Sequence, residues 1–431
     1  MDSQAINLNE TIQKLNNNVF QLLSERGKNI FFPKLGILSQ SAQAKGKKIN
    51  ATIGEAREDN GSSMHLSEFD KLINLPLASV YPYSPSFGNK ELRDTWKEFI
   101  YRKNPSMGTT AMSTPVVTCG LTHGISISGY LFVDEDDTII IPDLFWENYS
   151  LIFENGYHGK VLTFPFFNNG GFNIEGFTRT LDSVEGKIIL LLNFPNNPTG
   201  YTPLVSEIGL IVNAIRKQAD NGKRVVVLID DAYFGLVYEN NVYKESIFTQ
   251  LCNLDERVLA IKLDGPTKED YVWGFRVGFI SFGVKNGTSE LYEALENKTA
   301  GAIRGNVSNV SQLSQSLLYQ AYFSSGYEED KKVKFETLKS RYKSIIQVLA
   351  DPKYNEFFSA LPFNSGYFMC VELRYPLKAE AIRKILLDKY STGVIVFENL
   401  IRIAFSAVPQ SEIPELISNI YNACKDYLDQ K

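Results

Sequence analysis

The chain has 431 residues, of which 44% are hydrophobic and 22% are charged, with a net charge of −5 at neutral pH. This composition is that of a folded globular protein large enough for two or three domains. Its mild acidity argues against nucleic acid or an anionic membrane surface as the partner.

Cysteine and histidine usage points to a reducing compartment and away from a metal site. The four cysteines are far apart and only three histidines are present, so no metal-ligand spacing occurs and no metal is expected. The N-terminus, Met1-Asp2-Ser3-Gln4, lacks a basic segment and an apolar core, and no apolar run approaches about 18 residues. A cytoplasmic enzyme with reduced thiols and no membrane association is the expectation.

The predicted elements change in character along the chain. The first 50 or so residues are polar, with apolar side chains at helical spacing from Ile12 to Leu23, which predicts an arm or helix that packs on a larger body. From Val116 onward, short apolar runs alternate with longer amphipathic segments. Such runs without polar alternation are typical of strands buried on both faces of a largely parallel sheet. The seven predicted strands cover residues 116–119, 138–141, 160–164, 188–192, 225–229, 258–263 and 277–282.

These strands predict an α/β fold, with a mostly parallel seven-stranded sheet flanked by helices in a large domain at residues 80–330. After residue 330 the pattern becomes a charged helix at 328–349, a strand within 366–373, a helix at 378–389 and a strand at 400–405. This predicts a smaller α+β domain at residues 331–431, completed by an N-terminal arm and segment at residues 1–79.

One lysine and one arginine follow the strand predicted at 258–263. In an open α/β sheet, ligands bind outside the carboxyl ends of the strands. Lys268 lies at such an end, where loss of water would lower its pKa and free an amine for Schiff-base chemistry. Arg276, eight residues later, could hold an anion such as phosphate in two-point contact. Together they favour covalently bound pyridoxal phosphate, although a solvated lysine and arginine would be the ordinary reading of either alone.

Three other strand ends carry residues that suit such a cofactor. In Cys119-Gly-Leu-Thr-His-Gly124 the free amides of Leu121 and Thr122 would open a helix and form an anion site, or the glycine would simply make a turn. In Asn193-Phe-Pro-Asn-Asn-Pro-Thr-Gly200, Asn197 could donate to a phenolic oxygen. In Asp230-Asp-Ala-Tyr-Phe-Gly235, the Asp230 carboxylate could keep a pyridine nitrogen protonated, or it could cap a helix.

In this order the motifs resemble those of a fold type I, class I/II aminotransferase of the aspartate aminotransferase superfamily, over about residues 53–406. The resemblance implies pyridoxal 5′-phosphate as cofactor, with Lys268 as its Schiff-base residue and proton shuttle. Asp230 would pair with the pyridinium nitrogen. The other cofactor contacts that it implies are Tyr233 and Asn197 at the phenolic oxygen, Thr267, Arg276, Leu121 and Thr122 at the phosphate, and Trp146 stacked on the ring, unless Trp146 is a core residue.

The resemblance also implies substrate and partner contacts. Arg402 matches the arginine that binds the substrate α-carboxylate, and Gly54 matches the backbone that closes over it. Tyr83 matches a tyrosine that reaches the partner subunit's phosphate, with Tyr81 as a competitor, which implies a homodimer with shared active sites. Arg304 matches an arginine that reads a distal carboxylate across the dimer, or else it pairs at the subunit interface.

The chain departs from the family pattern at Gly265, where many relatives carry a serine or threonine that contacts phosphate. The expected function is amino transfer between an amino acid and a 2-oxo acid by ping-pong chemistry, with a dicarboxylic substrate such as aspartate, glutamate or 2-oxoglutarate as a hypothesis. A C–S lyase, or another elimination or decarboxylation enzyme of the same fold, is the alternative. A non-catalytic regulator that binds the cofactor is a third possibility. The first 50 residues argue against it, because they are too short and too little basic for a DNA-binding domain.

Overall fold

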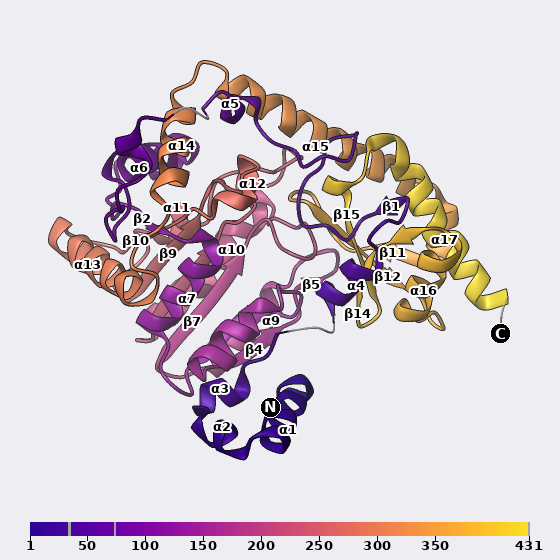
Figure 1. Cartoon of the computed structure of the whole chain (residues 1–431), viewed down its shortest axis with the longest axis horizontal. Coiled ribbons are helices and arrows are strands. Elements are labelled where there is room, and N and C mark those ends of the chain that lie inside the picture. Colours follow the sequence, from indigo (N-terminus) through magenta and orange to yellow (C-terminus); the bar gives the residue numbers. More distant parts are fainter. Residues whose placement is uncertain (33–35, 73–74, 430–431) are drawn as a thin grey trace.

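A seven-stranded sheet forms the centre of the protein in a computed structural model that describes residues 1–32, 36–72 and 75–429 (Figure 1). Six strands are parallel, and β10 runs antiparallel to both of its neighbours. This confirms the predicted α/β class, and each predicted strand agrees with the structure to within one residue at either end. In spatial order the strands are β2 (Val116–Thr118), β10 (Gly278–Gly283), β9 (Val258–Asp264), β8 (Arg224–Asp230), β7 (Lys187–Asn193), β3 (Thr138–Pro142) and β4 (Lys160–Phe164).

Both faces of this sheet are buried, which explains why its strands read as continuous apolar runs. Successive side chains of a strand point to opposite faces. In β7, Ile188 and Leu190 join one core cluster, whereas Ile189 and Leu191 join the other. The first cluster includes residues of α9 (Ile174–Ser183) and α10 (Val205–Asp220), and the second includes residues of α7 (Gly120–Phe132) and α13 (Ser289–Asn306).

A smaller antiparallel sheet lies in the C-terminal part of the chain. It has the strand order β11 (Phe358–Ala360), β12 (Phe368–Leu373), β15 (Leu400–Ala404) and β14 (Ile395–Phe397), with α16 (Ala379–Lys389) and α17 (Ile413–Asp429) beside it (Figure 1). The N-terminal segment joins this part, because β1 (Ile49–Asn50) pairs with β13 (Thr392–Gly393). This pairing supports the division predicted above, in which residues 1–79 complete a small domain, and the boundaries themselves stay a prediction.

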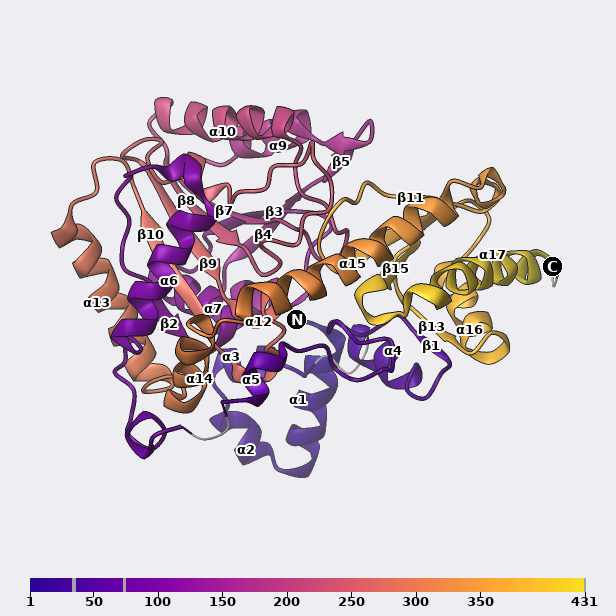
Figure 2. The same cartoon turned by 90° about the horizontal axis from the view of Figure 1, so that it is seen from above.

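Helix α15 (Tyr327–Leu349) links the two sheets. Its 23 residues span about 34 Å at the usual rise of an α-helix. Figure 2 shows it running from the region of α12 (Pro266–Glu269) beside the large sheet to the C-terminal sheet. The remaining helices and strands are α5 (Ser67–Asp70), α6 (Lys90–Lys103), α8 (Asn148–Ser150), α11 (Phe248–Leu251), α14 (Gln312–Tyr322), β5 (Phe167–Asn168) and β6 (Gly171–Phe172).

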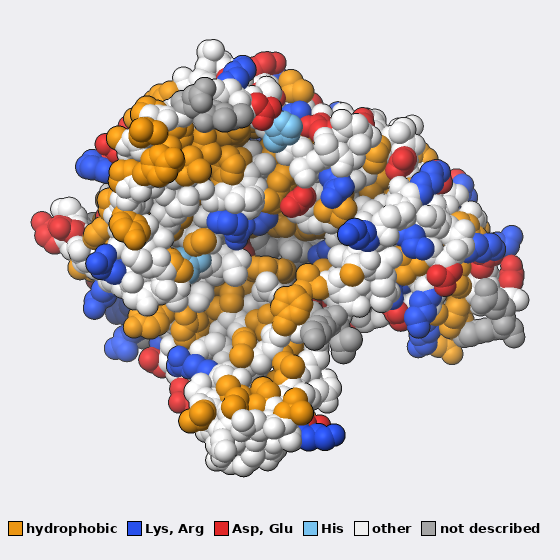
Figure 3. Space-filling model, in the orientation of Figure 1, with side chains coloured by type: hydrophobic (Ala, Val, Ile, Leu, Met, Phe, Trp, Pro, Cys, Tyr) orange, Lys and Arg blue, Asp and Glu red, His pale blue; other side chains and the backbone are white. Residues whose placement is uncertain are grey.

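The N-terminal arm is helical, as predicted. It forms three short helices, α1 (Ser3–Leu15), α2 (Asn17–Leu22) and α3 (Glu25–Asn29), and α4 (Ile37–Gln43) follows. The periodic side chains of Leu15 and Leu22 are exposed instead of buried, and Figure 3 shows apolar side chains gathered on the arm. The helical prediction is therefore confirmed, whereas the packing of this apolar stripe on a larger body stays a prediction. In the described part of the chain, no helix combines the length and the apolar character needed to cross a membrane.

Candidate active site

The carboxyl ends of strands of the large sheet and the two central strands of the small sheet border one cavity of about 970 Å³. Residues far apart in the sequence meet here because the parallel strands all end at the same edge of the sheet. The cavity is lined by eleven of the predicted site residues, namely Gly54, Leu121, Thr122, Trp146, Asn197, Asp230, Tyr233, Thr267, Lys268, Arg276 and Arg402.

Lys268 presents its amine in this cavity from the short helix α12, which begins two residues after β9 ends. The Lys268 Nζ lies 5.1 Å from the centroid of the Tyr233 ring. Burial and, to a smaller extent, the charge of Arg276 lower the pKa of the Lys268 amine to about 8, against an opposing effect of Asp230. A lysine with this pKa holds a substantial neutral fraction near neutral pH, which is the form that acts as a nucleophile or base.

Asp230 ends β8 as a buried carboxylate with a defined set of donors. The hydroxyl of Tyr149 donates to its Oδ2 at 2.5 Å, and the backbone N–H of Ala232 donates to its Oδ1 at 3.0 Å. Burial raises the pKa of the Asp230 carboxyl, whereas the bond from Tyr149 and the charge of Lys268 lower it. These donors hold the carboxylate in one orientation and favour its charged form.

Tyr149 is a site residue that the sequence reasoning missed. It is buried in α8, and its ring meets that of Trp146 edge-on with 5.6 Å between centroids. Its spacing of three residues from Trp146 could have indicated it in the sequence, because this spacing puts the two side chains on one face of a helical turn. Trp146 itself is half-buried and lines the cavity, so it is not a residue of the closed core.

The start of α7 and Arg276 form a cradle suited to an anion. Gly120 has a φ of +75°, a backbone conformation that favours glycine. A Cβ at this position would lie 2.6 Å from the Arg276 guanidinium, so the arginine lies directly against the start of α7. The helix N-terminus directs the free amides of Leu121 and Thr122 outward. Arg276 donates to the Trp273 carbonyl at 3.0 Å, and no carboxylate among the described residues forms an ion pair with it.

Thr267 and Gly265 complete this side of the cavity. The Thr267 hydroxyl makes only a long bond to the Val277 carbonyl, at 3.4 Å, and so retains capacity for another partner. A Cβ on Gly265 would lie 2.9 Å from the Cα of Gly278 and 3.0 Å from the Val277 carbonyl oxygen. Close packing of the two chain segments therefore explains why a serine or threonine is absent at Gly265.

Arg402 is a buried cation on the opposite side of the cavity, in β15. Its side chain is 4% exposed and its guanidinium lies 4.5 Å from the centroid of the Phe368 ring. It donates to Asn197 Oδ1 and to the Thr52 carbonyl, each at a long 3.3 Å. Across residues 1–32, 36–72 and 75–429 its Nε finds no hydrogen-bond partner and no carboxylate forms an ion pair with it. Burial lowers the pKa of the Arg402 guanidinium, and a buried cation of this kind is stabilised by an anion that pairs with it.

The structure does not bring every predicted residue to the cavity. Tyr83 and Tyr81 are 92% and 79% exposed, and Arg304 is exposed at the end of α13. None of the three lines the cavity of the single chain. Their predicted contacts were with a partner subunit, and they stay predictions.

Comparisons with known proteins agree with this architecture. The family model "Aminotransferase class I and II" matches residues 48–420. The mitochondrial aspartate aminotransferase of Saccharomyces cerevisiae is 25% identical over 228 residues, which cover 48% of this chain and 49% of that protein. An LL-diaminopimelate aminotransferase of Gloeobacter violaceus is 26% identical over 228 residues, or 52% of this chain and 55% of that protein. The matches thus span about half the length of these curated relatives.

Solved structures share the fold over nearly the whole chain. An aminotransferase of Anaerococcus prevotii superposes with a TM-score of 0.83 at 24% identity, covering 93% of this chain and 98% of that one. The cytoplasmic aspartate aminotransferase of Saccharomyces cerevisiae gives 0.76 at 18% identity, covering 96% and 100%. With the family model matched over residues 48–420 and the fold shared throughout, the chain belongs to the class I and II aminotransferase family.

Proposed function

We propose that the protein is a pyridoxal-phosphate-dependent aminotransferase that moves an amino group between an amino acid and a 2-oxo acid. The observation that carries the proposal is the convergence of four groups on one cavity: the Lys268 amine, the Asp230 carboxylate and the guanidinium groups of Arg276 and Arg402. Neither arginine has an ion-pair partner among the described residues. The cavity therefore offers a reactive amine together with two cations for anions, one from the segment after β9 and one from β15.

The residues fit pyridoxal phosphate, the cofactor used by this family. Arg276 and the amides at the start of α7 would hold the phosphate, since the guanidinium lies directly against the backbone of Gly120 at this helix N-terminus. Asp230, fixed by Tyr149, would face the ring nitrogen, and Trp146 would lie on the ring. When bound, the cofactor supplies an electron sink for the negative charge that develops at the substrate Cα.

The protein's own side chains supply the proton transfer. Lys268 Nζ has a pKa of about 8 because of burial, so it can take a proton at neutral pH and give it back. The Lys268 carbonyl accepts a bond from the Tyr367 hydroxyl at 2.8 Å, which fixes the backbone that carries the amine. Lys268 is therefore the residue proposed to move the proton at the substrate Cα.

Arg402 would orient the substrate. Its planar guanidinium matches a carboxylate in two-point contact, and beside its bonds to Asn197 and Thr52 its Nε has no partner among the residues that the structure describes. Gly54 lines the same cavity and would bring its backbone over the carboxylate. This arrangement favours α-amino acids and 2-oxo acids as the substrate class.

We infer a homodimer in the cytoplasm as the working form. The segment around Tyr83 supports the homodimer, because three large apolar or aromatic side chains lie exposed within seven residues: Leu77 (73%), Tyr81 (79%) and Tyr83 (92%). Exposed apolar patches of this kind are typical of protein–protein interfaces. Arg304 is likewise proposed to read a distal carboxylate in the partner's site. Replacing Arg304 with alanine would then raise the Michaelis constants of dicarboxylic substrates several-fold and leave those of monocarboxylic ones unchanged. Michaelis constants for dicarboxylic substrates that stay at the wild-type values would refute this role.

Amino transfer is tested by incubating the purified, cofactor-loaded protein with a panel of ¹⁵N-labelled amino acids and a 2-oxo acid. The proposal expects label in a new amino acid, and loss of that product in the Lys268→Ala variant. Release of pyruvate and ammonia without any 2-oxo acid would instead identify the C–S lyase or another elimination enzyme. No turnover of any panel member in either assay would refute the proposal.

A further inference from the structure

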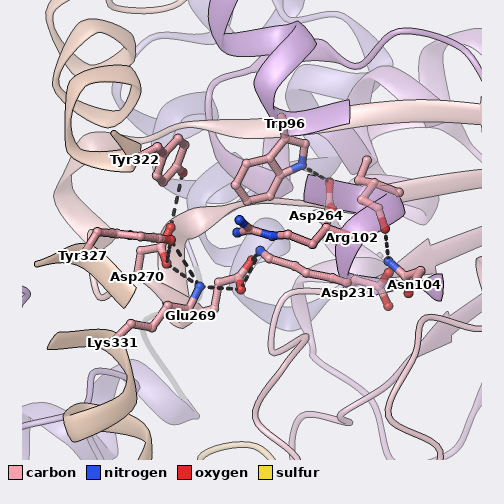
Figure 4. A network of polar contacts seen from close by, with 12 residues as sticks. Trp96, Arg102, Asn104, Asp231, Asp264, Glu269, Asp270, Tyr322, Tyr327 and Lys331 are labelled. Carbon is pink, nitrogen blue, oxygen red and sulfur yellow. Dashed lines mark hydrogen bonds and ion pairs between the residues drawn. The ribbon is translucent and has the colours of Figure 1, made fainter. Parts of the chain in front are cut away.

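A cluster of buried charges lies directly behind Lys268. The next two residues, Glu269 and Asp270, are 5% and 0% exposed. Lys103 Nζ contacts Glu269 at 2.8 Å, while Lys331 Nζ contacts Glu269 at 2.8 Å and Asp270 at 2.7 Å. Figure 4 shows both carboxylates turned toward Lys331, with Tyr322 and Tyr327 beside Asp270. We call Lys103, Glu269, Asp270 and Lys331 the charge cluster.

The charge cluster is balanced, and Lys331 is its central cation. Two carboxylates face two ammonium groups, and the hydroxyls of Tyr327 and Tyr322 donate to Asp270 at 2.8 and 3.2 Å. Burial would lower the pKa of Lys331, but its two carboxylate partners outweigh burial and raise it. Lys103 has one carboxylate partner, and the effect of burial outweighs that of the partner, so the pKa of Lys103 is lowered. Loss of Lys331 would leave two buried carboxylates with a single cation.

Lys331 connects Lys268 to the substrate side of the cavity through α15. Ten residues further along this helix, Arg341 is fully buried and donates to the carbonyl of Ser406, the second residue after β15. Arg341 also pairs with Asp59, which follows the Gly54 segment, at 2.9 Å. One helix thus contacts the segment that carries Lys268 and the segments next to Arg402 and Gly54 (Figure 2).

We propose that Lys331 is a positioning residue that fixes α12, and with it Lys268, against α15 and cancels the negative charge of Glu269 and Asp270. The inference rests on the proposed role of Lys268 in the cofactor reaction. Lys331 itself does not line the cavity. It acts through the backbone of α12 and through the electrostatic potential at Lys268.

The groups that face Lys268 determine the direction of the effect. Asp230 raises the pKa of the Lys268 amine and Arg276 lowers it, whereas the paired carboxylates of Glu269 and Asp270 have no resolved effect on it. Removing the Lys331 charge leaves the cluster with a net charge of −1 beside Lys268. A nearby negative charge favours the protonated amine, so the proton at Lys268 Nζ would be held to higher pH.

The test compares Lys331→Met, Lys331→Arg and Lys334→Met as full-length proteins loaded with pyridoxal phosphate. The pH midpoint of the change in the visible absorbance band reports the proton at Lys268 Nζ. We expect Lys331→Met to raise this midpoint by about 0.5 to 1 unit, and Lys331→Arg to restore the wild-type value. Lys334→Met is the matched control, because it removes a 2.7 Å ion pair with Glu58 from the same helix without touching α12; its midpoint should not move.

Thermal unfolding of each variant separates positioning from simple stabilisation. A Lys331→Met protein that unfolds at lower temperature with an unshifted midpoint would overturn the inference. If Lys331→Met does not fold, Lys103→Met is the substitute variant, because it removes the other cation of the charge cluster. It should shift the pH midpoint in the same direction, and an unshifted midpoint in Lys103→Met would also overturn the inference. Absence of a cofactor band in the wild type would refute the proposed function and this inference together, whereas a wild-type band with unshifted variants refutes the inference alone.

Discussion

Replacing Arg402 with methionine separates the functional role of this side chain from a structural one. A buried charge without an ion-pair partner has a desolvation cost of several kcal/mol. The contacts that offset it are two hydrogen bonds of 3.3 Å and one ring contact at 4.5 Å. At 3.3 Å these bonds are longer than usual, so each is counted at about 0.5 to 1.5 kcal/mol and the ring contact at about 0.5 to 2 kcal/mol, or about 1.5 to 5 kcal/mol together. Because cost and gain nearly cancel, Arg402→Met should lower the free energy of unfolding by less than about 1 kcal/mol, or raise it.

Catalysis should respond very differently. If Arg402 holds the substrate carboxylate, truncation removes a buried charge pair worth about 2 to 5 kcal/mol in binding. That corresponds to a fall in kcat/KM of about 30-fold to 5,000-fold. Urea denaturation gives the stability of wild type and variant, and steady-state kinetics with the identified amino donor give kcat/KM. A variant destabilised by more than about 2 kcal/mol that retains wild-type kcat/KM would refute the reasoning, because Arg402 would then be a structural residue.

Two further predictions follow from the buried carboxylates. Tyr149→Phe removes the 2.5 Å bond to Asp230. Because bonds to charged groups contribute about 1.5 to 3 kcal/mol, the dissociation constant of the cofactor, measured by equilibrium dialysis, should rise at least tenfold. An unchanged dissociation constant would contradict the role of Tyr149. Lys103 and Lys331 lower the pKa of Glu269 in the folded state, despite the opposing effect of burial. Glu269 therefore stabilises the folded protein above its unfolded pKa of about 4.3, and this stabilisation is lost as the pH falls toward the folded value. Denaturation at a series of pH values from 7 to 3 should show a shallower loss of stability in Glu269→Gln than in wild type, and parallel curves would count against this assignment.

The sequence predicts the sheet well because its strands are buried on both faces. Runs such as 188–192 need no alternation, so their limits are set by the polar residues that follow them. The residues at those strand ends share one edge for the same topological reason, which is why the predictions at Asp230 and Lys268 lead to one cavity. The N-terminal arm was less predictable, because helical periodicity shows which side chains share a face but not whether anything covers that face.

The contacts that tune the site could not be predicted from local pattern. Tyr149 and Asp230 are 81 residues apart, and their bond depends on the tertiary placement of α8 against β8. Lys331 lies 62 residues from Glu269, on a helix that reads simply as charged and amphipathic. Such pairs become visible only when buried side chains and their partners are located in space.

The central claim is that Lys268 is the residue that binds the cofactor covalently. The most direct measurement is to load the protein with pyridoxal phosphate, reduce it with borohydride, digest it and locate the added mass by peptide mass spectrometry. The account predicts a single modified peptide with the added mass on Lys268, and none in the Lys268→Ala variant. Stoichiometric modification of a different lysine, with Lys268 unmodified, would contradict it.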